Sequence, residues 1–533
     1  MPVILETLIL ALALLFALSY ARLWTSPAQH EAKSKDEKPF WVSRNVVGVE
    51  SDSPLRWLWA RLISIKYICV WTTEGYAKYC QRSLPFTVPT LDAGPVLALP
   101  INLIKPIYSL PEHILNVHGV QDETMQVHWV FPDKYLRRER FQFNVVRNQL
   151  TQNIPALTGT VAQEIRWGFE RAWGMDREWK EVRVWPNALR IVAGAANGVF
   201  CGAPLCTDIV FLDRMKDHAM TIFAGALLLN CVPKILHPIF GPLLSLASAI
   251  MGHRAMKRSL PIVKERLALT EKWNAETDPK WSLPNDALQW LITESTLSSN
   301  PTAQLTPHRL ALRLLFVNDV SMLTTAYTAQ NLILDLFSTP PSANYIPLLR
   351  AECAAALAAS HGIWDTEAVG RLRGVDSAIR ESMRLNPFGT LILPREVVAE
   401  EGVDVPGVGR VPRGTRIAVP SEAIQRDGSV YDDPDTYLPF RFAQPSTTTS
   451  SSPSSSPQPP RHAVTLDPTF LAFGVPGRWA CPGRFFAIME LKIFVAEMLL
   501  HYDVEFLERR PGPVYALWSR YPPDVGVRVR RRV

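Results

Sequence analysis

The chain has 533 residues, of which 47% are apolar, and this is enough for a large buried core. Its formal net charge of +6 is small for the length, and no domain-scale basic block occurs, so we expect no nucleic-acid partner. The seven cysteines are scattered without a C-x-x-C pair, which argues against a zinc site and a disulfide framework. We therefore expect the polypeptide to lie mostly in a reducing compartment.

Residues 1–24 have the composition of a membrane anchor. The stretch VILETLILALALLFAL is apolar except for Glu6 and Thr7, and the segment up to Trp24 would span roughly 33 Å as a helix. No cleavage site is evident, and the positive charges follow it, which by the positive-inside rule leaves the bulk of the protein in the cytosol. An exposed helix of a soluble protein is the alternative, at a high cost in apolar surface.

The rest of the chain has one polar linker and one long folded region. We assign 25–45 to the linker and 46–533 to a single domain, because no second long linker interrupts it. Helical periodicity dominates, in 137–152, 158–174, 208–224, 308–337, 346–360, 366–385 and 484–500. Strand-like runs cluster late, in 389–399, 403–419 and 514–530. The predicted fold class is mainly α with small β-sheets.

Two further segments stand out by composition. Residues 445–460 are almost entirely Ser, Thr and Pro, so we predict a disordered surface insertion. Residues 222–251 are strongly apolar but are interrupted by prolines, a glycine and Lys234. We expect core helices there, and not a second membrane span; a surface that dips into the membrane is the alternative.

The stretch FGVPGRWACPGRFFA, residues 473–487, presents one cysteine before a predicted helix. A thiolate at Cys481 is a strong ligand for iron, and haem iron can be held by one protein sulfur. Gly477 and Gly483 would permit a tight turn close to a flat macrocycle, and Arg478 could meet a haem propionate. A buried structural cysteine is the alternative.

This loop resembles the haem-binding loop of the cytochrome P450 superfamily, Phe-x-x-Gly-x-Arg-x-Cys-x-Gly. The segment IRESMR is similar to the family's Glu-x-x-Arg helix, and YLPFRF to the motif whose arginine completes that network. By this resemblance, Glu381, Arg384 and Arg441 form a buried charged network. Arg395 in LILPREVV, and Arg147 four residues after Phe143, match in place arginines that reach the haem.

This sequence departs from the family pattern at three places. Phe473 stands eight residues before Cys481 where seven is usual, which predicts a local bulge at Val475–Pro476. The position two before the cysteine, often Arg or His in the family, is Trp479, whose indole N–H can still donate a hydrogen bond. In the long helix, the family's Ala-Gly-x-Asp/Glu-Thr aligns with a stretch that carries Leu323 in place of the acid.

That alignment gives the candidate catalytic residues. Ser321 stands at the glycine, and Thr324 and Thr325 at the threonine pair, so the resemblance implies that Thr324 helps to deliver protons to dioxygen. We expect Asp319 one turn earlier on the same face, where water could connect it to the threonine. A Thr324 hydroxyl bonded to the preceding turn is the alternative. Expected pocket walls are 110–130, 319–327 and 388–393.

The resemblance implies a cytochrome P450 fold behind a single transmembrane helix, with haem b held by Cys481. It implies a monooxygenase that takes O2, and electrons from NADPH through a separate NADPH–cytochrome P450 reductase, since no flavin or nicotinamide fingerprint is evident. GYAKYC, VVRNQLT and WACPGRFFA are similar to filamentous-fungal members of secondary metabolism. The expected substrate is a lipophilic small molecule, first a terpenoid, then a polyketide or alkaloid.

Two other classes of function stay open. Some relatives of this fold rearrange their substrates without a reductase, and Leu323 is compatible with such an isomerase. A membrane-tethered binding protein without catalysis is the third class. The expected location of the enzyme is the endoplasmic reticulum membrane, single-pass, with the catalytic domain facing the cytosol.

Overall fold

The computed structural model describes residues 45–50, 53–443, 461–477 and 479–532. The predicted anchor at 1–24, the linker up to residue 44, the predicted insertion at 445–460 and Arg478 lie outside the described residues. The described part is mainly helical with small sheets, as predicted.

The α-helices are α3 (Pro54–Lys78), α4 (Ile101–Tyr108), α5 (His118–Thr124), α6 (Val127–Val130), α7 (Lys134–Arg138), α8 (Gln142–Asn144), α9 (Thr151–Trp173), α10 (Val184–Phe200), α11 (Ile209–Asn230), α12 (His237–Ala275), α13 (Ala287–Thr296), α14 (Pro301–Gln304), α15 (Pro307–Phe337), α16 (Tyr345–Ala359), α17 (Thr366–Arg371), α18 (Arg373–Leu385), α19 (Ser421–Gln425) and α20 (Arg484–His501). A π-helical turn, Val145–Leu150, joins α8 to α9.

The strands are β1 (Phe86–Thr90), β2 (Gly94–Ala98), β3 (Leu115–Asn116), β4 (Lys180–Arg183), β5 (Ile392–Val397), β6 (Val403–Val405), β7 (Gly409–Val411), β8 (Arg416–Val419), β9 (Tyr502–Val504), β10 (Val514–Ala516), β11 (Ser519–Tyr521) and β12 (Gly526–Arg531).

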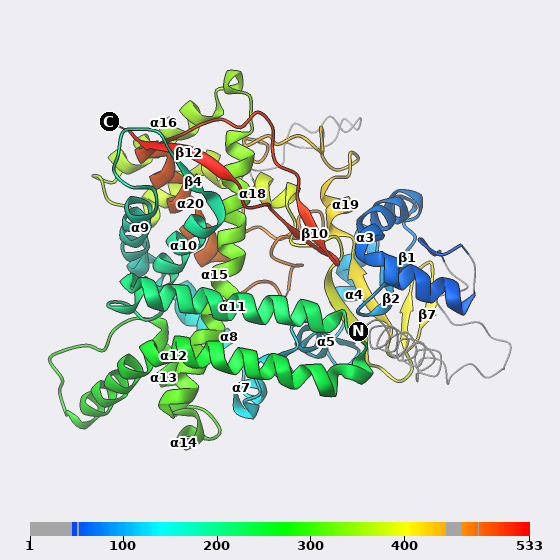
Figure 1. Ribbon diagram of the computed structural model, residues 1–533, viewed down its shortest axis with the longest axis horizontal. Helices are drawn as coiled ribbons and strands as arrows, with labels where there is room; N and C mark the ends of the chain where they lie inside the picture. Colours follow the sequence, from blue (N-terminus) through cyan, green and yellow to red (C-terminus); the bar gives the residue numbers. More distant parts are fainter. Residues whose placement is uncertain (1–44, 51–52, 444–460, 478, 533) are drawn as a thin grey trace, which may run out of the picture.

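The helix α15 runs through the helical part of the molecule and organises its core (Figure 1). It contacts α10, α18 and α20, and α10 and α20 in turn pack on α9. Most of its second half is buried, from Thr325 to Phe337. Such a helix is apolar on most sides because it is surrounded by others, and this is why its sequence shows a long apolar run.

A five-stranded sheet in the order β1-β2-β8-β5-β3 lies beside the helical part, with α3 against β1 (Figure 1). The hairpin β1–β2, in which Phe86 pairs with Ala98, was not predicted from the sequence. Its two strands are buried almost throughout, so they lack the alternation of apolar and polar residues that marks a half-exposed strand. Two prolines inside them also argue against strands by sequence.

The helices α11 and α12 lie side by side across α15 (Figure 1). Helices occupy 222–251 as expected, with a break between Asn230 and His237, but Pro242 does not end α12, which runs for 39 residues through Pro242 and Pro261. One face of α12 is buried, with residues at helical spacing such as Leu244, Ser248 and Gly252. Among the described residues, only the helical stretch Lys234–Ala275 is long and apolar enough to cross a membrane.

Candidate functional site

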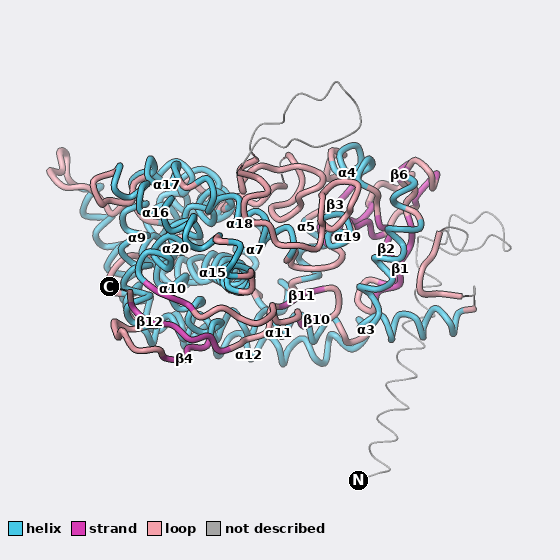
Figure 2. The backbone as a smooth tube through the Cα atoms, turned by 90° about the horizontal axis from the view of Figure 1, so that it is seen from above, coloured by secondary structure: helices cyan, strands magenta, loops and turns pink. Residues whose placement is uncertain are grey.

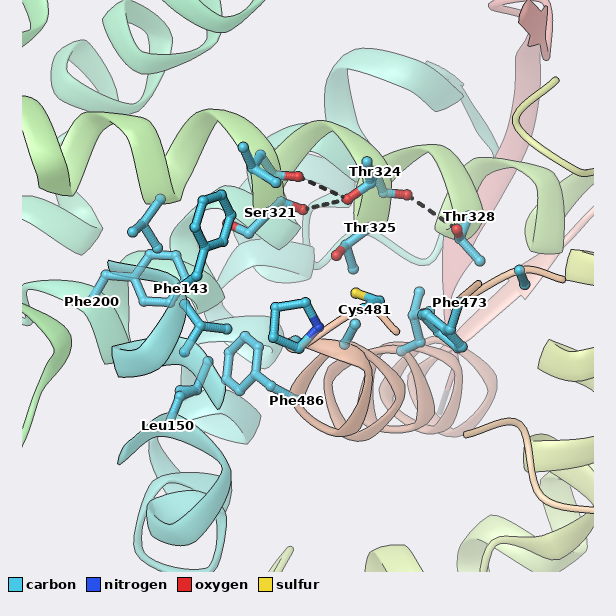
Figure 3. Close-up of a pocket in the computed structure, with 18 of the residues that line it drawn as sticks. Phe143, Leu150, Phe200, Ser321, Thr324, Thr325, Thr328, Phe473, Cys481 and Phe486 are labelled. Atoms are coloured by element: carbon cyan, nitrogen blue, oxygen red, sulfur yellow. Dashed lines mark hydrogen bonds between the residues drawn. The ribbon is translucent and has the colours of Figure 1, made fainter. Parts of the chain in front are cut away.

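A cavity of about 230 Å³ lies between α15 and the loop that precedes α20 (Figure 3). The walls are mostly apolar and aromatic, and their polar groups are few. The lining residues are Gln142, Phe143, Val146, Leu150, Phe200, Phe316, Val317, Val320, Ser321, Thr324, Thr325, Thr328, Met383, Phe388, Ala472, Phe473, Cys481, Pro482, Gly483, Phe486, Ala487 and Leu491.

Cys481 lies in the cavity wall opposite α15, and its sulfur points toward that helix in Figure 3. The loop is held by its own backbone: the N–H of Cys481 donates to the carbonyl of Phe473 at 2.9 Å. Gly477 has φ +130°, a conformation that other residues rarely adopt. The loop ends at Gly483, directly before the first turn of α20.

The charge state of Cys481 depends on two opposing effects. Burial raises the pKa of its thiol, whereas backbone N–H groups of Gly483 and Arg484 and the Arg484 guanidinium lower it, and the net result is above the usual value. These donors belong to the start of α20, whose positive end favours an anion. A bound metal cation would supply the remaining stabilisation that the thiolate needs.

The other loop residues lie around the sulfur as follows. Phe473 and Gly483 line the cavity with Cys481. Trp479 makes an edge-to-face contact with His118, with ring centroids 4.8 Å apart. Val475, next to the extra position of the loop, is buried in the core of the sheet region. The longer loop is therefore packed into the core at Val475, whereas Pro476 and Gly477 are exposed.

Arg395 on β5 is a buried cation without an anionic partner. Its side chain is 3% exposed, one guanidinium nitrogen donates to the carbonyl of Pro394 at 2.9 Å, and its charge lies over the ring of Tyr108. No carboxylate among the described residues forms an ion pair with it, and burial lowers its pKa despite Tyr108 and Glu112. Such a group fits an acidic substituent of a bound cofactor. Arg147, in contrast, is exposed on the π-helical turn and does not line the cavity.

The structure brings Glu381, Arg384 and Arg441 together. Arg384 donates to both oxygens of Glu381, at 2.7 and 2.8 Å, and Arg441 adds a third bond at 2.9 Å. Arg384 also donates to the carbonyls of Gln425 and Pro434, at 2.6 and 2.7 Å. The charges of this buried network are therefore paired and hydrogen-bonded, as buried charges must be.

Gln425 is a residue that the sequence analysis missed. Its Nε2 donates to the carbonyl of Arg384 at 2.8 Å, and its Oε1 accepts from the N–H of Leu471, also at 2.8 Å. Leu471 lies two residues before Phe473. Gln425 thus connects the charged network to the cysteine loop. A lone glutamine in a short helix carries no sequence signal for such a role.

Ser321, Thr324 and Thr325 of α15 all line the cavity opposite Cys481 (Figure 3). The Thr324 hydroxyl lies 3.0 Å from the carbonyl of Val320 and 3.1 Å from that of Ser321, to either of which it can donate. This is the alternative that the sequence left open. Its lone pairs remain available to accept a hydrogen bond. Leu323 is buried in the main core and does not line the cavity.

The expected placement of Asp319 is wrong. Its carboxylate does not line the cavity and lies 3.0 Å from the imidazole of His218 on α11. The physical reason is helical geometry: positions 319 and 324 are five residues apart and differ by about 140° around the axis. Burial raises the pKa of Asp319, and His218 partly offsets this.

The predicted cavity walls are confirmed in part. Phe388 and residues between 320 and 325 line the cavity, but no residue of 110–130 does. The aromatic residues Phe143, Phe200, Phe316 and Phe486 form much of the wall instead. They come from four separate helical segments, so no local pattern could have grouped them.

A cysteine faces an apolar cavity beneath a long helix, and a buried Glu-x-x-Arg network lies behind its loop. A protein sulfur placed in this way is suited to holding haem iron. The family model Cytochrome P450 matches residues 211–520. The chain belongs to the cytochrome P450 family, and it is a cytochrome P450 monooxygenase. The family implies a haem-thiolate cofactor, and Cys481 and Arg395 fit one by their chemistry.

Curated relatives are similar over most of their length. Cytochrome P450 monooxygenase okaG of Penicillium ochrochloron is 39% identical over 87% of this chain and 89% of its own. Cytochrome P450 monooxygenase htyF of Aspergillus rugulosus is 32% identical over 89% of this chain and 70% of its own. Cytochrome P450 monooxygenase gloP of Glarea lozoyensis is 29% identical over 92% of each chain.

Proposed function

We propose that this monooxygenase hydroxylates or otherwise oxidises a lipophilic secondary metabolite of the terpenoid class, with O2 and electrons from NADPH through a separate reductase. The observation that carries the proposal is the position of Cys481 in the wall of a cavity that is apolar almost throughout. An apolar wall selects a hydrophobic molecule and excludes water from the reacting centre. The fungal relatives are compatible with secondary metabolism.

The residues would divide the work as follows. Cys481 would hold the haem iron, and Arg395 would pair with a haem propionate. A haem bound through a thiolate supplies oxygen activation, since the sulfur donates electron density that favours O–O cleavage. The Thr324 hydroxyl donates to a backbone carbonyl, so its lone pairs would accept from a proton donor, such as water, near the reacting atoms. The aromatic wall orients the substrate.

The cysteine substitution Cys481→Ser tests the proposal. We expect the wild-type protein to show the carbon monoxide difference band of a thiolate-ligated haem and the variant to lack it. Cys353→Ser, in a buried cysteine on α16 far from the cavity lining, is the matched control and should keep the band. An unchanged band in the Cys481 variant would contradict the proposal.

Substrate class is tested by metabolite profiles. A deletion strain of the source organism that is complemented with Cys481→Ser should accumulate a less oxidised terpenoid. The same strain complemented with wild type should not. Accumulation of a polyketide or an alkaloid would replace the terpenoid class and leave the monooxygenase proposal in place.

A rearrangement enzyme that needs no reductase is the second candidate. It is favoured by Leu323, which is buried where the family's acid would stand, and by a cavity whose described lining holds no carboxylate. Turnover without NADPH and reductase would establish this candidate, and strict dependence on both would exclude it.

We also propose attachment to the endoplasmic reticulum membrane with the catalytic domain in the cytosol. Besides the predicted anchor, the outer face of α12 exposes Ile239, Leu243 and Leu246. The helix α3, which exposes Leu55 and Trp59, lies along the same edge (Figure 2). Large exposed apolar surfaces mark membrane or protein contacts. The full chain should stay with microsomes after carbonate extraction, and release into the supernatant would contradict attachment.

A further inference from the structure

His218 and Asp319 form a buried polar contact outside the cavity lining. His218 lies on α11 and Asp319 on α15, and the exposed fraction of each side chain is 2%. The imidazole Nδ1 lies 3.1 Å from one carboxylate oxygen of Asp319 and 3.0 Å from the other. Among the described residues, this is the only side-chain hydrogen bond between α11 and α15. Removing one partner of such a buried contact leaves the other without compensation, which is costly.

The third helix of this region, α12, closes over the pair. A Cβ atom at Gly252 would lie 3.3 Å from the Nε2 atom of His218, so a side chain there would crowd the imidazole. The same helix holds the segment below it: Ser245 donates to the carbonyl of Trp129 at 2.6 Å, and Ser248 to that of Val130 at 2.9 Å. The backbone just before Phe131 is therefore fixed by α12.

Phe131 connects the pair to the cavity. Its ring packs edge-on against His218, with centroids 6.0 Å apart, and against Phe316 at 5.0 Å. Phe316 in turn contacts Phe143 at 5.7 Å, and these two rings line the cavity. A movement of His218 would thus be transmitted through packed rings to the wall, because closely packed side chains cannot move independently.

We propose that His218 and Asp319 are a positioning pair that holds α11 on α15 and thereby sets the aromatic wall against which the substrate lies. This proposal rests on the proposed function, in which the aromatic wall contacts the substrate. It adds a pair of residues outside the cavity that determines how well a substrate fits. A pair with a structural role alone would affect stability without affecting which ligands fit.

The test compares two azoles that bind the same iron. Imidazole is small and needs only the iron, whereas clotrimazole carries a bulky triaryl body that must fit against the wall. In Asp319→Ala, the ratio of the clotrimazole Kd to the imidazole Kd should rise at least about tenfold, as for other coupled buried groups. Asp319→Asn should shift the ratio in the same direction by less, because the bond loses its charge. The double variant His218→Asp with Asp319→His exchanges the two partners, and it should restore the pair and bring the ratio within about threefold of wild type.

The neighbouring residue supplies a matched control. Asn318 is buried on the same helix but accepts from Asn197 of α10 at 2.8 Å, on a side away from the pair. Asn318→Ala should lower the melting temperature and leave the Kd ratio unchanged. Equal ratios in wild type, Asp319→Ala and Asn318→Ala would overturn the proposal.

Hydrogen–deuterium exchange separates this proposal from the proposed function. Asp319→Ala should speed amide exchange in the middle of α11, around His218, and Asn318→Ala should not. This readout needs no haem. A wild-type protein without an azole-induced spectral change would defeat the proposed function, and unchanged exchange in α11 would defeat the positioning pair.

Discussion

Arg384 donates two hydrogen bonds to the carboxylate of Glu381, and neither side chain is exposed to solvent. The two residues stand three positions apart on α18, on one side of the helix. Through Gln425, the same network reaches the backbone just before the cysteine loop. The network therefore fixes the position of the cysteine loop relative to the helical core.

Breaking this network should destabilise the fold. We expect Glu381→Gln to lower the free energy of unfolding by about 3–5 kcal/mol, because it leaves the buried Arg384 and the partly buried Arg441 without their counter-charge. Urea unfolding and the haem content of the purified protein measure the effect. Glu367→Gln is the control, since its partner Arg371 and Glu367 itself are largely exposed, and it should change stability by less than about 1 kcal/mol. Equal effects of the two substitutions would contradict the prediction.

Removal of the buried charge at position 395 should weaken haem retention. We expect Arg395→Met to transfer haem to apomyoglobin about tenfold faster than wild type, because a charge-assisted hydrogen bond to a propionate is lost. Arg413→Met, at an exposed arginine of the turn before β8, should behave as wild type. If the Arg395 variant released haem at the wild-type rate, the residue would have no role in holding the cofactor.

The hydroxyl of Thr324 should couple electron use to product formation. We expect Thr324→Val to lower the product formed per NADPH at least about tenfold with an unchanged haem content, since it removes a polar group that faces the cavity. Thr324→Ser should retain the yield. Thr328→Val is the matched control, because Thr328 lines the same wall one turn further along and its hydroxyl, like that of Thr324, donates to a carbonyl of the preceding turn. This variant should keep the wild-type yield. Identical yields for Thr324→Val and wild type would exclude this role.

Glu497 on α20 should make stability depend on pH in the acid range. Burial alone would raise its pKa, but the close imidazole of His501 and the hydrogen bonds from Arg166 and Trp364 outweigh this and lower the pKa from 4.5 to about 2. A lowered folded-state pKa stabilises the fold above the unfolded value, and this stabilisation is lost as the pH falls from about 5 to about 2. The loss should amount to about 3 kcal/mol in the free energy of unfolding.

The measurement for Glu497 is urea unfolding of wild type and Glu497→Gln across that pH range. The difference in stability between the two proteins should be largest near neutral pH and should shrink as the solution is acidified. Glu508→Gln, at an exposed acid in the loop between β9 and β10, serves as the control. A difference that stayed constant with pH would refute the assignment.

Much of the site is encoded in short stretches of sequence. The loop around Cys481 and the pair Glu381–Arg384 are local, because their members stand within one turn or one helix, where spacing decides which side chains meet. The helices over 308–337 and 484–500 follow from apolar periodicity and correspond to α15 and α20. Arg441 was assigned from family resemblance, and the structure places it against Glu381 across 60 positions of sequence.

Tertiary packing decided the rest. Sequence could not show that Asp319 turns toward His218, since the direction of a residue on a helix has meaning only once the neighbouring helices are known. Nor could it show that α12 continues through two prolines with one face on α11 and α15, because the packing of that face compensates for the hydrogen bonds that proline removes. The cavity itself is built from rings of four distant segments, and only the folded chain brings them around one sulfur atom.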